Sequence, residues 1–161
     1  MTSSVKIRRG VLLACSAVLL GGGLLGPVAS AGASDASIKS VIKSYSSRIL
    51  VAEGHVVSAL GEYKKSGDPS GVTSAITASV SVLRSLKSAI RTQIASSPKV
   101  KQGKAKFEKG LQKVIVGYQH LKTAFGEKKA RPQAAKQQAA IALNSLKRAK
   151  KELNEGAKLL R

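Results

Sequence analysis

The feature that most constrains this chain is an apolar repeat that returns every three or four residues through four successive segments. Alternating steps of four and three place the repeating residues along one side of an α-helix. In the first two segments the repeat consists of Ile38, Ile42, Tyr45, Ile49, Ala52, Val56, Ala59 and Tyr63, and then of Val72, Ile76, Val80, Leu83, Leu86, Ile90 and Ile94. In the last two it consists of Phe107, Leu111, Val114, Tyr118, Leu121 and Phe125, and then of Ala139, Leu143, Leu146, Leu153, Ala157 and Leu160, with Lys150 interrupting it. No segment alternates with a period of two over a useful length, so the pattern predicts helices and no strands.

Three short segments separate these repeats, and each contains a proline suited to begin a helix. The segments are KKSGDPSG, ASSPKV and FGEKKARPQ. Asp68 and Ser97, each followed by a proline, are predicted N-caps, because a side-chain oxygen there accepts a free backbone N–H group. Gly126 is expected to end the third helix. Arg131, which precedes the last of these prolines, is a poor N-cap.

These patterns predict an all-α fold, an antiparallel up-down-up-down four-helix bundle, over residues 35–161. Helices of about 28 residues would each be roughly 40 Å long. The short connections make successive helices antiparallel neighbours. The alternative is a pair of helical hairpins that associates with another chain. The last segment supports this alternative, since its stripe is rich in alanine and offers only a thin apolar face.

Residues 1–31 are predicted to be a signal peptide. MTSSVKIRR is a basic start, GVLLACSAVLLGGGLLG is an apolar run, and PVASAGAS offers small residues at the cleavage spacing, after Ala31 or Ala33. The apolar run is broken by glycines and is short for a membrane span of roughly 20 residues. Arg8 and Arg9 leave both the Sec type and the twin-arginine type of signal open. We expect the protein to be secreted or associated with the cell envelope, outside the cytoplasm.

The composition offers few groups for catalysis. The only cysteine, Cys15, lies in the predicted signal peptide, and the chain has two histidines and eight acids. There is no glycine-rich phosphate loop, no Gly-x-Ser-x-Gly and no paired-histidine motif. We therefore expect no enzymatic activity, no catalytic or metal-binding residue and no cofactor. His55 and His120 would lie at similar heights on parallel helices, but each is at the rim of its stripe, and whether they share a site stays open.

Positive charge is concentrated in the second half of the chain. The formal net charge is +20, and loss of Lys6, Arg8 and Arg9 with the signal peptide leaves +17. Residues 34–98 carry eight basic and four acidic residues, whereas residues 99–161 carry seventeen basic and four acidic. A solvated helix face usually mixes both signs, because like charges repel. A domain this basic favours binding to polyanions.

The candidate anion-binding residues repeat at steps of three and four on the third and fourth helices, away from the apolar stripes. They are Lys99, Lys106, Lys109, Lys113, Lys147, Lys151, Lys158 and Arg161. The expected partner is an anionic cell-envelope polymer, an acidic polysaccharide or lipid headgroups, with nucleic acid bound only non-specifically. Lysine outnumbers arginine, which suits diffuse contact between point charges.

Two other functions are compatible with the same pattern. The bundle interior could carry an apolar ligand or a haem, with the alanine-rich last helix as a lid. The chain could also be a structural or partner-binding helical module. The sequence leaves the identity of the ligand and the oligomeric state open.

The mature protein should begin at Gly32 or Ser34 and should be recovered outside the cytoplasmic membrane. The reason is the order of basic start, apolar run and small-residue site. Intact-mass spectrometry of the protein from its host measures the N-terminus. Mature protein that retains Met1 would contradict the prediction.

Overall fold

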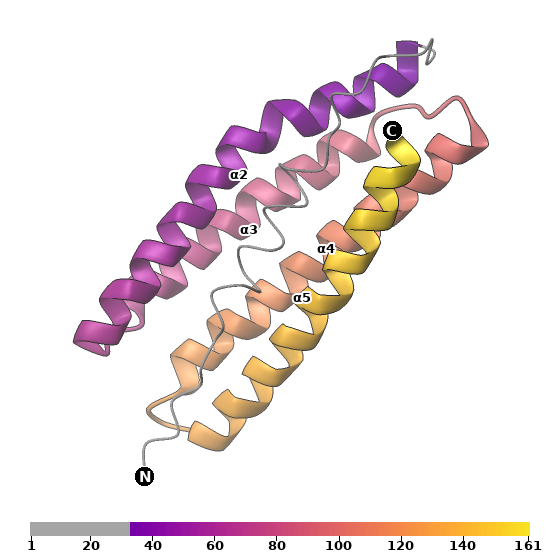
Figure 1. Ribbon diagram of the computed structural model, residues 1–161. Coiled ribbons are helices and arrows are strands. Elements are labelled where there is room, and N and C mark those ends of the chain that lie inside the picture. The colour runs from indigo at the N-terminus through magenta and orange to yellow at the C-terminus, as the bar shows by residue number, and fades with distance from the viewer. Residues whose placement is uncertain (1–32) are drawn as a thin grey trace.

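A computed structural model describes residues 33–161, with side chains from residue 36 onward, as four α-helices without a strand. The helices are α2 (Ala33–Ser66), α3 (Ser70–Arg91), α4 (Pro98–Glu127) and α5 (Pro132–Leu160). Successive helices run in opposite directions, and α2 lies beside α3 while α4 lies beside α5 (Figure 1). The prediction of an all-α chain with four helices is confirmed. None of the four described helices is long and apolar enough to cross a membrane.

The predicted signal peptide and the Arg8–Arg9 pair lie outside the described residues. So do the side chains at both predicted cleavage sites.

Side chains from all four helices form one hydrophobic core. The stripes predicted from the sequence supply most of it, and Leu86, Leu111 and Leu153 are fully buried. Tyr45 and Tyr63 are half-buried and pack against the core. Helices of this length are held mainly by burial of such an apolar face, because helix propensity alone is marginal in water.

The stripe prediction is wrong at Ile94, whose side chain is 76 % exposed. Helix α3 ends at Arg91 with Thr92 as its C-cap, so Ile94 belongs to the connection that follows. A residue beyond the helix end no longer follows the helical spacing, and its side chain need not face the core.

One of the two predicted N-caps is confirmed. The Ser97 hydroxyl accepts the N–H of Val100 at 3.2 Å, so Ser97 is confirmed as the N-cap of α4. Asp68 is not the N-cap of α3, so that prediction is wrong. The N-cap is Pro69, which precedes the first helical residue Ser70 and makes no side-chain cap hydrogen bond. The Asp68 carboxylate instead accepts the backbone N–H of Ser70 at 3.0 Å in the turn before the helix. Arg131 makes no side-chain cap at α5, as expected of a poor N-cap.

The prediction that Gly126 ends the third helix is wrong. Helix α4 continues through it to Glu127. The glycine that does end a helix is Gly67, which has φ 72° and whose N–H donates to the backbone oxygen of Tyr63 at 2.8 Å at the end of α2. That left-handed conformation costs glycine little, because it has no Cβ.

Helices α4 and α5 meet along a seam of small residues spaced seven apart on each helix. The seam consists of Gly103, Gly110, Gly117 and Ala124 on α4 and of Ala135, Ala142, Ala149 and Gly156 on α5, all of them buried. A Cβ on Gly110 would lie 2.7 Å from Leu153 Cγ, and one on Gly156 would lie 2.8 Å from the backbone nitrogen of Phe107. The distance between packed helices depends on the side chains at the contact. Small residues therefore let these two backbones approach closely.

The seam also explains how α5 avoids burying Lys150. The buried face of α5 runs through Ala142, Leu146 and Ala149, while Leu143 is only half-buried and Lys150 is exposed. The thin alanine face of α5 is therefore not exposed to solvent, because α4 covers it.

Replacing Gly156 with alanine should lower the free energy of unfolding by about 1–3 kcal/mol, the usual cost of overpacking. The new Cβ would overlap backbone atoms of α4, which cannot rotate away as a side chain can. Denaturant unfolding followed by circular dichroism measures the change.

The matched control is Gly54→Ala on α2. A Cβ there meets nothing within 4 Å. Alanine is the better helix former, so this variant should be more stable by about 0.5–1 kcal/mol. If Gly156→Ala also left the free energy of unfolding unchanged or raised it, the inference that the backbones of α4 and α5 lie in close contact would be wrong.

Candidate functional site

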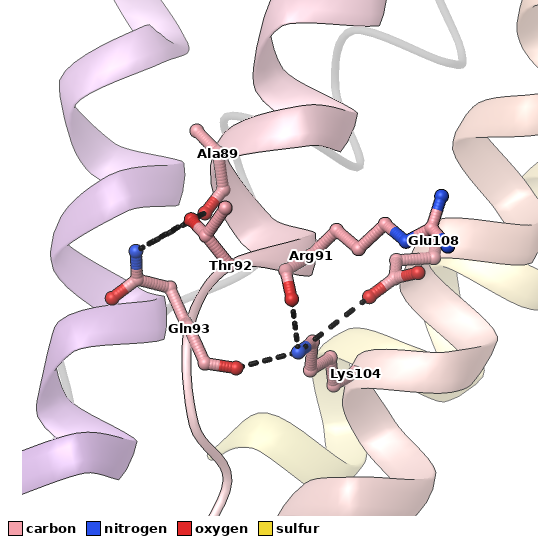
Figure 2. Close-up of polar contacts among 6 residues, drawn as sticks. All are labelled: Ala89, Arg91, Thr92, Gln93, Lys104 and Glu108. Carbon is pink, nitrogen blue, oxygen red and sulfur yellow. Dashed lines mark hydrogen bonds and ion pairs between the residues drawn. The ribbon is translucent and has the colours of Figure 1, made fainter.

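The lysine-rich segment 98–114 forms the first half of α4, and its Lys104 reaches back to the end of α3 (Figure 2). Lys104 Nζ donates to the backbone oxygens of Arg91 at 2.8 Å and Gln93 at 2.5 Å. It also lies 3.9 Å from Glu108 Oε1, one turn further along α4. Carbonyl oxygens at a helix C-terminus carry partial negative charge, and a cation there stabilises the helix end. Lys104 therefore fixes the connection between α3 and α4.

Glu152 on α5 binds two of the predicted anion-binding lysines. Lys113 Nζ lies 3.0 Å and Lys109 Nζ lies 3.1 Å from the same carboxylate oxygen of Glu152. The hydrogen bond from Lys113, followed by that from Lys109, holds the pKa of Glu152 below its ordinary value. The side chain of Lys109 is 64 % exposed, whereas that of Glu152 is 15 % exposed. The carboxylate thus lies beneath its lysines, and Lys109 in particular faces solvent.

Glu155, one turn further along α5, binds two more of the predicted residues. Lys106 Nζ donates to Glu155 Oε2, and Lys151 Nζ lies 4.0 Å from Glu155 Oε1. The bond to Lys106 lowers the pKa of Glu155 and raises the pKa of Lys106. Both acids of α5 thus pair with lysines of α4 and α5. Exposed pairs of this kind contribute little to stability.

The other four predicted residues take no part in these ion pairs. They are Lys99, Lys147, Lys158 and Arg161, all of them exposed. No ion pair within the described residues involves them. The backbone oxygen of Arg161 accepts a hydrogen bond from Lys39 Nζ at 3.2 Å, which joins the end of α5 to α2. The structure therefore brings four of the eight predicted residues into contact with shared acids and leaves four as separate exposed cations.

A cationic groove that we did not predict from the sequence lies between α3 and α4. It has a volume of about 410 Å³ and is lined by Arg84, Lys87, Ser88 and Arg91 of α3 and by Gln112, Ile115 and Gln119 of α4. Lys87 Nζ donates to Gln112 Oε1 at 2.6 Å across the groove. The available signal was the spacing of the three cations, which places them on one face of a helix.

The two histidines have different surroundings. His55 is exposed on α2, whereas His120 on α4 is half-buried with its Nδ1 2.6 Å from Gln138 Oε1 on α5. Within residues 36–161 no group of three or more histidine, cysteine or acidic side chains is placed to hold a metal ion. Nothing in this geometry favours a site shared by the two histidines.

Glu53 is an acid to which the sequence suggested no role, and it is buried on α2. Its side chain is 8 % exposed, and its Oε2 has no hydrogen-bond partner among the residues that the structure describes. Burial disfavours the charged form and raises the pKa of Glu53 from 4.5 to about 8. Glu53 lies four residues after Ile49 and three before Val56, both buried, and that spacing was the signal that it shares their face.

Comparisons of the chain with models of protein families, with curated proteins and with solved structures find no match.

Stability should fall as the pH rises from about 5 to about 8.5, and Glu53 should be a major cause. An unfolded glutamate ionises near pH 4.5, whereas folded Glu53 keeps its proton until about pH 8. Its raised pKa therefore favours the folded state fully below about pH 4.5, and this advantage is lost as the pH rises through about 8. Over this pH range, the free energy of unfolding of the wild type should fall by roughly 3–4 kcal/mol more than that of Glu53→Gln.

Glu62→Gln is the control, because Glu62 is an exposed acid on the same helix. It should keep the pH dependence of the wild type. Denaturant unfolding at a series of pH values measures the difference. Identical pH profiles for wild type and Glu53→Gln would mean that the Glu53 carboxyl is hydrated.

Proposed function

We propose that this chain is an exported, non-enzymatic protein whose helices form an up-down-up-down four-helix bundle. Its function is to bind anionic polymers or surfaces of the cell envelope. Binding takes place through the lysine face, by which we mean the eight candidate residues of α4 and α5: Lys99, Lys106, Lys109, Lys113, Lys147, Lys151, Lys158 and Arg161.

The observation that carries this proposal is the excess of cations over acids on α4 and α5. Residues 99–161 have seventeen basic and four acidic residues. On the lysine face, Glu152 and Glu155 are each shared by two lysines, so this surface keeps a positive charge after all these pairs have formed. Such an excess attracts a polyanion and favours its binding through release of the counterions condensed on it.

The ion pairs also hold part of the face in place. Glu152 keeps the ammonium groups of Lys109 and Lys113 beside each other on one oxygen. An ammonium group has three donors, so each lysine can still bind an anion from the solvent side. Because the carboxylate lies beneath them, an approaching phosphate or sulfate group meets the lysines first.

The alternative of an apolar-ligand carrier is less well supported. It would require α5 to act as a lid over an interior space. The seam between α4 and α5 is filled instead, since Gly110 and Gly156 have no room even for a methyl group. This observation favours an external binding surface over an internal one.

The proposal is tested by neutralising the four residues of the lysine face that form no ion pair in the described part of the chain. The variant replaces with glutamine Lys99, Lys147, Lys158 and Arg161. Affinity for duplex DNA, heparin and phosphatidylglycerol vesicles is measured over a range of salt concentrations. For the wild type, log affinity should fall linearly with log salt. For the DNA probe, the slope should decrease by about one for each replaced cation that contacts a phosphate.

The matched control removes four exposed cations from α2. It replaces with glutamine Lys43, Arg48, Lys64 and Lys65. Both variants lower the net charge by the same amount, so the control should lose less affinity if the face is a localised site. Equal losses would mean that only the total charge matters. If the wild type bound none of the three probes at low salt, the proposed function would be refuted.

A further inference from the structure

The groove between α3 and α4 has the geometry of an anion site separate from the lysine face. Arg84, Lys87 and Arg91 occur three and four residues apart, so they follow one another along a single face of α3. Seven residues of helix separate the first from the last, which is roughly 10 Å. Gln112 and Gln119 are spaced in the same way on α4, opposite these cations. The row of cations is therefore long enough to contact more than one anionic group.

Neutralising acids are absent from the residues that line this groove. Glu108 lies one turn before Gln112 on α4, and its neighbour at 3.9 Å is Lys104. This distinguishes the groove from the lysine face, where Glu152 and Glu155 already occupy four lysines. An anion entering the groove does not have to displace a carboxylate of the protein.

The groove also supplies the better donors. The guanidinium group of an arginine offers two parallel N–H donors to one phosphate or sulfate, whereas lysine acts as a point charge. Gln112 accepts from Lys87 through Oε1, which leaves its amide N–H groups available to donate. The groove is floored by Ile115, which is 3 % exposed. Charged and amide donors above an apolar floor suit an anion with a short carbon linker.

Lys104 holds one end of this groove in position. Arg91 is the last residue of α3, and a helix end normally frays. The hydrogen bond from Lys104 to the backbone oxygen of Arg91 ties that end to α4 (Figure 2). The Arg91 side chain thus projects from a fixed backbone.

We propose that the α3–α4 groove binds successive phosphodiester groups of a linear anionic polymer through Arg84, Lys87 and Arg91. This proposal rests on the proposed function, because its ligand belongs to the same class of anionic polymers. It assigns that ligand to a different and more specific site. A phosphodiester is also present in lipid headgroups. A recessed groove that runs along two helices for roughly 10 Å accepts a single thread more readily than a headgroup held in a flat bilayer.

The test compares arginine variants of the exported protein with a soluble glycerol-phosphate oligomer as the probe. Arg84→Gln with Arg91→Gln should weaken binding about tenfold or more, because it removes both bidentate donors. Arg84→Lys with Arg91→Lys keeps the charge and should weaken binding by an intermediate factor. The control, Arg131→Gln with Arg148→Gln, removes two exposed arginines elsewhere and should change affinity less than about threefold. Thermal unfolding should be alike for all variants, since these arginines are exposed.

Equal losses from the groove variant and its control would overturn the groove assignment. If phosphatidylglycerol vesicles bound as tightly as the oligomer and lost affinity equally in the groove variant, a lipid headgroup would replace the linear polymer as the occupant. If polymer binding depended on the lysine face alone, the proposed function would stand and the groove assignment would be wrong.

A titration with inorganic pyrophosphate separates the two proposals further. Saturable shifts in the amide NMR signals of the groove residues would support the groove even if no polymer were bound and the proposed function had failed. Unchanged signals at these residues would refute the groove.

Discussion

The close approach of α4 and α5 is the contact on which the rest of the described structure depends. Gly103, Gly110 and Gly117 face α5, and Gly156 brings the α5 backbone against that of Phe107. With side chains this small, the two helices interlock through Leu146, Leu153 and Leu160, which are buried between them and the core. The same contact sets the register of α5 along α4. That register is what places Glu152 and Glu155 within reach of the lysines of α4.

Helix α4 is consequently flanked by two cationic surfaces of different character. Toward α5, ammonium groups share two carboxylates, so positive charge is held in place and partly offset. Toward α3, two arginines and a lysine line a groove that no acid lines. The first surface suits diffuse attraction of a polyanion, and the second suits defined contacts with individual anionic groups. Lys104 belongs to neither surface, but its hydrogen bond to the backbone oxygen of Arg91 fixes the end of α3 beside the groove.

Local signals in the sequence predicted the helices well wherever the local chemistry alone determined the outcome. The Ser97 hydroxyl caps α4 because its acceptor lies three residues from a free N–H, which needs no other part of the chain. The same kind of reasoning failed at Gly126, where glycine is tolerated within a continuous helix, and at Ile94, where α3 stops early. The spacing of Glu53 from Ile49 and Val56 places it on their face, but an acid there can still turn its carboxyl to solvent, and its burial depends on the neighbouring helices.

The sequence by itself determined the all-helical fold, the number of helices and most of the core. The reason is that the apolar face of a helix recurs every three or four residues along the chain. It also determined the excess of positive charge. Only the tertiary structure decided which cations are paired and which are free, because Lys106, Lys109 and Lys113 find their acids about forty to fifty residues away on α5. It likewise decided that Arg84, Lys87 and Arg91 border a groove, since a groove needs a second wall and that wall is α4. Partners on another helix depend on how closely and in what register the helices pack, and the spacing of residues within one helix does not contain that information.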